Sequence, residues 1–158
     1  MGVLLLLMAL AATGCQTTKP RNDVLVRFQE WASLDPPSRL LAAREMPQEK
    51  ASMVRWLEQY MRGQYHVIDE RYVLTRPGFT NWAAIGSKAG QYMEQELGAT
   101  YLEQQWDEKE WSEFDDYRIE YWRVDQATPR YFAIVMTREP LPGPDERKLF
   151  GYFELAVR

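Results

Sequence analysis

The chain has 158 residues, of which 46% are hydrophobic and 27% are charged, so it can form one compact domain but not two of ordinary size. Six Trp, nine Tyr and six Phe exclude a disordered or low-complexity chain, because each ring can bury a large apolar area. A formal net charge of -4 disfavours nucleic-acid binding. One Cys and one His exclude an internal disulfide and a Cys/His zinc cluster.

Residues 1–14 are an apolar stretch without a charged side chain, and Cys15 follows directly. At about 1.5 Å per residue this stretch is well short of the roughly twenty residues that cross a hydrocarbon core, so we expect a cleaved export signal. The small residues at positions 12–14 before Cys15 resemble the lipobox of bacterial lipoproteins. The resemblance implies that Cys15 is lipidated, with palmitate among its acyl chains. Gln16 rather than Asp after the Cys implies the outer membrane.

Two or more acyl chains anchor a protein stably where one does not, so lipidated Cys15 would hold the chain on the membrane. Residues 15–21 are polar and contain Pro, which predicts a short tether behind the lipidated Cys. Residues 22–158 then make a single domain. The alternative is that residues 1–14 form a buried helix of the domain and Cys15 is an ordinary apolar filler.

The first part of the domain shows helical spacing of its apolar residues. This spacing predicts a helix over residues 24–32, which Pro36 and Pro37 separate from the next element. A short helix is expected to begin at Ser38. Pro47 suits the first turn of a further helix that ends at about Gly63.

The second part alternates between strand and helix patterns. A strand is predicted over residues 64–75 and a helix over residues 81–97. Gly86 and Gly90 lie one helical turn apart, which we interpret as close packing of this helix against a sheet rather than a nucleotide-binding loop. The remaining length predicts an antiparallel meander of three strands, over residues 117–125, 130–138 and 148–157.

This order predicts an α+β domain in which the N-terminal helices and one central helix pack on one face of a curved antiparallel sheet that ends in the meander. The order resembles the cone-shaped nuclear-transport-factor-2-like fold. The last strand carries aromatic residues on both faces. A small ligand or a partner chain could therefore occupy a concave surface lined by Trp122, Tyr131, Phe150 and Tyr152. Alternatively, helices on both faces would bury these rings.

Few side chains are suited to catalysis. His66 is the only imidazole, and neither a nucleophile elbow nor a phosphate-binding glycine loop is present. Residues 103–116 hold seven carboxylates, and a pair of them could in principle cleave a cell-wall glycan. Crowded carboxylates on a polar segment stay solvated, however, which leaves no raised pKa for a general acid. The ligand spacing of a calcium loop is also missing. We expect no catalytic residue, no metal and no cofactor.

The same acidic segment contains three aromatic rings, a composition that suits the basic surface of a partner protein. Trp106 is expected to be structural, because it lies at helical distance from Tyr101 and Leu102. The expected partner-binding residues are Glu110, Trp111, Glu113, Phe114 and Asp115. The alternative is that the rings cover the core while the acids face water.

Taken as a whole, the sequence predicts an outer-membrane lipoprotein that faces the periplasm and binds protein without catalysis, as an accessory or assembly factor of an envelope complex. The alternatives are a small-ligand-binding or inhibitory module and a cell-wall glycan hydrolase. A pocket of roughly 300 Å³ or more among the sheet aromatics would favour the ligand module. A flat aromatic patch would favour the assembly factor, and two buried, facing carboxylates would favour the hydrolase.

Overall fold

The computed structural model describes residues 23–32, 39–79, 82–102 and 116–158, and these form an α+β domain as predicted. The helices are α1 (Asp23–Ala32), α2 (Pro47–Tyr60), α3 (Trp82–Gly90) and the π-helical segment η1 (Gln91–Glu96). The strands are β1 (Arg39–Leu40), β2 (Tyr65–Leu74), β3 (Thr100–Tyr101), β4 (Tyr117–Val124), β5 (Arg130–Thr137) and β6 (Leu149–Val157).

The strands form one antiparallel sheet with the order β1-β2-β6-β5-β4-β3. Strands β4, β5 and β6 are consecutive neighbours, so the predicted meander is confirmed. Strand β6 also pairs with β2 along the full length of β2, with a bulge between Val67 and Asp69. This pairing places the C-terminal strand inside the sheet, between β2 and β5.

Most predicted elements are confirmed, with differences at two positions. Pro47 is the first residue of α2, and Gly63, at φ +68°, follows the helix as predicted. The short helix expected from Ser38 is wrong: Leu40 lies in β1, because its backbone pairs with Val73 of β2. The helix expected to continue to residue 97 widens into a π-helix after Gly90.

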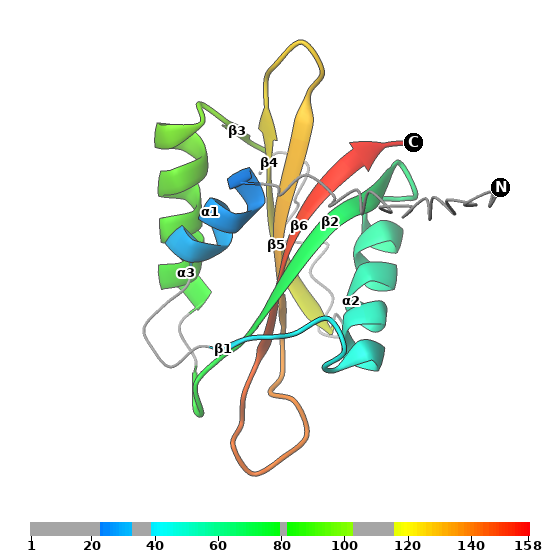
Figure 1. Cartoon of the computed structure of the whole chain (residues 1–158), viewed down its shortest axis with the longest axis vertical. Coiled ribbons are helices and arrows are strands. Elements are labelled where there is room, and N and C mark those ends of the chain that lie inside the picture. The colour runs from blue at the N-terminus through cyan, green and yellow to red at the C-terminus, as the bar shows by residue number, and fades with distance from the viewer. Residues whose placement is uncertain (1–22, 33–38, 80–81, 103–115) are drawn as a thin grey trace, which may run out of the picture.

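Helices cover both faces of the sheet (Figure 1). Helices α1 and α3 lie against one face, and α2 lies against the other. The expectation that all helices pack on one face is therefore wrong, and the alternative of two covered faces is confirmed. The reason is visible in β6: Phe150 and Tyr152 point to the α1–α3 face, whereas Phe153 and Leu155 point to the α2 face. Both faces are apolar, so both need a cover.

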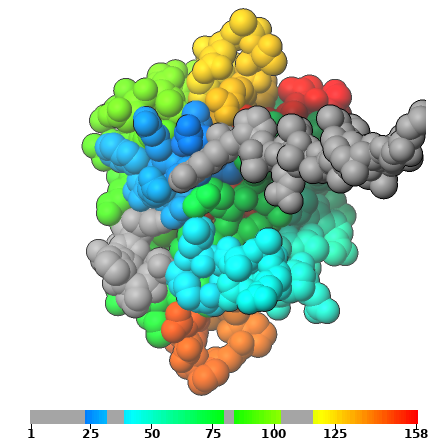
Figure 2. All heavy atoms as spheres, viewed as in Figure 1, coloured from blue at the N-terminus to red at the C-terminus, as the bar shows by residue number. Residues whose placement is uncertain are grey.

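Each face has its own hydrophobic core. Figure 2 shows α1, in blue, packed beside the green α3 segment. The largest fully buried side chains of the core under α1 and α3 are those of Phe28, Trp122, Phe132, Phe150 and Tyr152. The core under α2 is built around Met53, Leu57, Ile119, Phe153 and Leu155.

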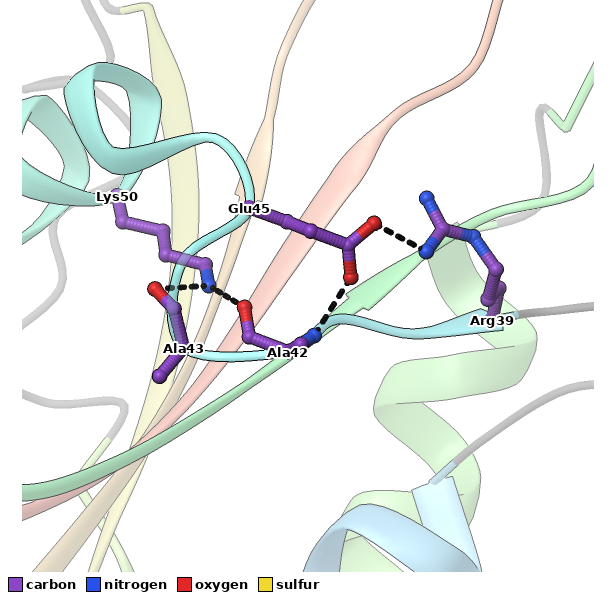
Figure 3. A network of polar contacts seen from close by, with 5 residues as sticks. All are labelled: Arg39, Ala42, Ala43, Glu45 and Lys50. Atoms are coloured by element: carbon purple, nitrogen blue, oxygen red, sulfur yellow. Dashed lines mark hydrogen bonds and ion pairs between the residues drawn. The ribbon is translucent and has the colours of Figure 1, made fainter.

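A polar network fixes the turn that leads into α2 (Figure 3). The buried ammonium of Lys50 donates to the carbonyl oxygens of Ala42 and Ala43, at 2.6 and 3.3 Å. The carboxylate of Glu45 accepts from Arg39 and, at 2.7 Å, from the backbone N–H of Ala42. These bonds satisfy polar groups of a turn that has no regular secondary structure.

We expect the pKa of Glu45 to lie below its ordinary value, because the side chain of Arg39 and the N–H of Ala42 bond to its ionised form. A lowered carboxyl pKa means that these contacts are complete above the unfolded-state pKa and are lost as the pH falls through the folded-state pKa. An NMR titration should show the Glu45 carboxyl and the Ala42 amide responding with one midpoint. In Arg39→Ala that midpoint should rise; an unchanged midpoint would contradict the network.

Candidate functional site

A groove of about 410 Å³ lies between the helical segment α3–η1 and the strands β3 and β4. It is open to solvent rather than enclosed. Its walls are mainly polar and come from two sides, the helix and the sheet edge. The residues that line it are Gly86, Ser87, Gly90, Gln91, Glu94, Gln95, Tyr101, Glu120 and Trp122.

Gly86 allows the sheet to approach the helix closely. A Cβ atom added to Gly86 would lie 2.6 Å from Oε1 and 2.7 Å from Oε2 of Glu120. The carboxylate of Glu120, a residue of β4, therefore lies directly on the backbone of α3. This confirms for Gly86 the close packing that the glycine pair predicted.

Gly90 has a different neighbour. A Cβ atom there would lie 3.3 Å from Oε1 of Glu94, which belongs to the following π-helical turn. The same carboxylate oxygen accepts a hydrogen bond of 3.4 Å from the indole Nε1–H of Trp122. The packing at Gly90 is thus within the helical segment, and it positions Glu94 over the sheet edge. π-Helical turns are frequent at functional sites.

The groove carries hydrogen-bond acceptors and negative charge. Among the described residues that line it, the only charged ones are Glu94 and Glu120. The phenol of Tyr101 and the indole of Trp122 lie side by side, with ring centroids 5.6 Å apart. Two carboxylates, two amide side chains and the partly exposed ring of Tyr101 can recognise a cation or a hydrogen-bond donor.

The carboxylates that suggested a glycan hydrolase, in residues 103–116, lie outside the described residues except for Asp116, which is exposed. In the groove, Glu94 is exposed and accepts the Trp122 N–H. Within the described parts of the chain, no three His, Cys, Asp or Glu residues are grouped to hold a metal.

The predicted aromatic lining needs correction. Trp122, Phe150 and Tyr152 are brought together, but each is only 1% exposed, in the core beneath α1 and α3. Tyr131 lies on the opposite face, where its ring is 4.8 Å from that of Tyr65. The four rings therefore do not line one concave surface, because helices cover both faces. Of the four, Trp122 lines the groove, at the edge of the sheet.

The other predicted residues divide into two groups. His66 lies in β2, opposite Ala156 of β6, and it is not among the groove residues. The lipidation residue Cys15 lies outside the described residues. The same holds for the expected partner-binding residues Glu110, Trp111, Glu113, Phe114 and Asp115.

A second cluster of polar groups, at the end of the sheet near the β5–β6 loop, is structural. Lys148 donates from Nζ to the carbonyl oxygen of Arg138 at 2.6 Å. Burial, and then the charge of Arg118, lowers the pKa of Lys148. The hydroxyl of Thr75 accepts the backbone N–H of Lys148 at 2.8 Å. These contacts join the ends of β2, β5 and β6.

Sequence reasoning did not identify Glu94, Glu120, Gln91 or Gln95 as groove residues. The sequence signal that existed was the pair of glycines one turn apart, followed by an acid four residues after Gly90. Glu120 carries no such signal, because its position depends on how β4 is placed against α3.

Within the residues that the structure describes, no helix is both long and apolar enough to cross a membrane. No protein-family model, curated protein or solved structure matches this chain, so its function has to be argued from the residues themselves.

Proposed function

We propose that this chain is a lipoprotein of the bacterial outer membrane, anchored through Cys15 and facing the periplasm, whose domain binds a protein partner without catalysis. Its role is that of an accessory or assembly factor of an envelope complex. The observation that supports a binding role is the open groove of about 410 Å³ at the edge of the sheet, with its two carboxylates.

The openness of the groove favours a protein partner over a free small molecule. Sites for small ligands bury most of the ligand surface, usually in apolar clefts. This groove is open and mainly polar, so it would leave a small ligand largely in water. A protein partner gains the missing contact area from the surface around the groove. The volume exceeds the 300 Å³ that would favour a ligand module, but the lining is not the aromatic one that this alternative requires.

The lipobox at the N-terminus supports the location. Helix α1 begins at Asp23, eight positions after Cys15, and eight extended residues span at most about 29 Å. An anchor at Cys15 therefore keeps the domain close to the membrane surface, where partners in an envelope complex can reach it.

The location is tested by labelling cells with radioactive palmitate. The wild-type protein should incorporate the label, and Cys15→Ser should lose it completely, because the thiol is the attachment point. If Cys15→Ser still incorporated the label, or if the mature wild-type protein retained Met1, the proposed anchor would be wrong.

The binding role is tested in the same cells by site-specific photo-crosslinking. A photoreactive residue at Ser87 or at Gln95, both exposed on the groove wall, should form a discrete adduct with an envelope protein. The matched control is Glu146, an exposed residue of the β5–β6 loop outside the groove. Adducts of equal yield at all three positions, or none at the groove, would contradict the proposal.

A further inference from the structure

We infer that the groove between α3–η1 and β3–β4 receives a basic side chain, Lys or Arg, of the protein partner. This inference rests on the proposed function and names the chemistry of its contact. In this groove, a helical segment and a strand bring two negatively charged side chains together.

The charge of the groove is complementary to a cation. Glu94 comes from η1 and Glu120 from β4, and no basic residue is among the described residues that line the groove. Charged groups of one sign on the wall of a groove attract the opposite charge and fix the register of a partner. A cation that enters the groove meets carboxylates from both of its walls.

The two carboxylates approach the same short stretch of the helix. Glu120 lies against Gly86 and Glu94 lies against Gly90, two positions one helical turn apart. A charge-assisted hydrogen bond joins heavy atoms at about 2.7–2.9 Å. An ammonium or guanidinium group that enters this stretch of the groove can bond to either carboxylate.

The remaining groove residues suit the rest of a basic side chain. The partly exposed ring of Tyr101 offers an apolar surface to the alkyl stem, and ring faces also attract cations. The side-chain carbonyls of Gln91 and Gln95 can accept further hydrogen bonds from the charged group. A metal ion is a poorer fit, because the described lining holds no imidazole or thiolate for a transition metal and only two carboxylates toward the roughly six to eight oxygen ligands of Ca²⁺.

The test uses the full lipidated chain in detergent micelles and NMR detection of the Trp122 indole N–H and the Gly86 amide. The probes are the peptides acetyl-Ala-Ala-Lys-Ala-Ala-amide, its Arg counterpart and its norleucine counterpart, which keeps the alkyl stem without charge. The Lys and Arg peptides should shift both signals in a saturable way, and the norleucine peptide should not. Equal shifts with norleucine, or no saturable shift with either basic peptide, would overturn the inference.

Two variants remove charge while preserving shape. Glu94→Gln and Glu120→Gln should each weaken binding of the basic peptides about tenfold, as expected for loss of one charge-assisted contact. The matched control Glu139→Gln neutralises an exposed acid outside the groove and should leave the affinity unchanged. An effect of equal size in all three variants would show general charge attraction and overturn the groove as the site.

The in-cell crosslinks separate this inference from the proposed function. If the double variant Glu94→Gln/Glu120→Gln kept the wild-type adduct at Ser87, the cation contact would be wrong and the protein-binding role would stand. If the wild-type chain formed no groove adduct, the proposed function itself would fail. Spermidine that bound more tightly than the Lys peptide would identify a free polyamine and overturn the assignment to a protein side chain.

Discussion

Phe28→Ala is expected to lower the free energy of unfolding by about 3–5 kcal/mol, the usual cost of removing a buried ring. Phe28 of α1 is 0% exposed. Its ring lies 5.6 Å from the rings of Trp122 and Tyr152, and 6.4 Å from that of Phe132. One side chain thus joins α1 to all three strands of the meander, β4, β5 and β6. A domain of ordinary stability, about 5–15 kcal/mol, would lose a large part of its margin.

The matched control is Trp31→Ala on the same helix. Trp31 is 42% exposed and stacks on Tyr92 at 5.6 Å, so its removal should cost much less than that of Phe28. Urea unfolding followed by circular dichroism measures both variants. If the two variants lost equal stability, or if Phe28→Ala unfolded like the wild type, α1 would not hold the position that the structure gives it.

Gly151→Ala is expected to destabilise the domain by about 1–3 kcal/mol through overpacking. A Cβ atom at Gly151 of β6 would lie 2.4 Å from two ring carbons of Phe153 and 2.7 Å from Sδ of Met53. Phe153 and Met53 are both 0% exposed in the core under α2, so neither can move without disturbing its neighbours. The added methyl should push α2 away from the sheet.

The matched control is Gly86→Ala, where the added Cβ would meet the carboxylate of Glu120. A carboxylate at the end of a flexible side chain can turn away, and Ala stabilises a helix by roughly 0.5–1 kcal/mol relative to Gly. Thermal melts should therefore show a lower midpoint for Gly151→Ala and no loss for Gly86→Ala. A loss of equal size at both positions would contradict the distinction between a rigid and a yielding neighbour.

Local sequence patterns determined most of the helices and strands. The Pro at position 47 and the Gly at position 63 bound α2, because Pro lacks the N–H that an interior turn needs and Gly adopts positive φ without strain. Alternating β-branched and aromatic residues identified β4, β5 and β6. These signals act over a few neighbouring residues, so they can be recognised without the fold.

The covering of the two sheet faces was left open by the sequence. Alternation showed that β6 has rings on both sides, but it could not show which helix reaches which side. Leu40 was expected in a helix and lies in a strand, because pairing with Val73 supplies bonds that no local pattern predicts. Contacts between distant segments override weak local preferences.

Only the tertiary structure determines which residues line the groove. Gly86 was recognised as a point of close approach, and only the placement of β4 beside α3 made Glu120 the group that fills it. Glu94 joined the site because the helix widens into a π-turn after Gly90 and its carboxylate meets the indole of Trp122. The sequence by itself determined most of the elements, since these depend on adjacent residues. The fold decided which acids line the groove, because that depends on the packing of segments far apart in the chain.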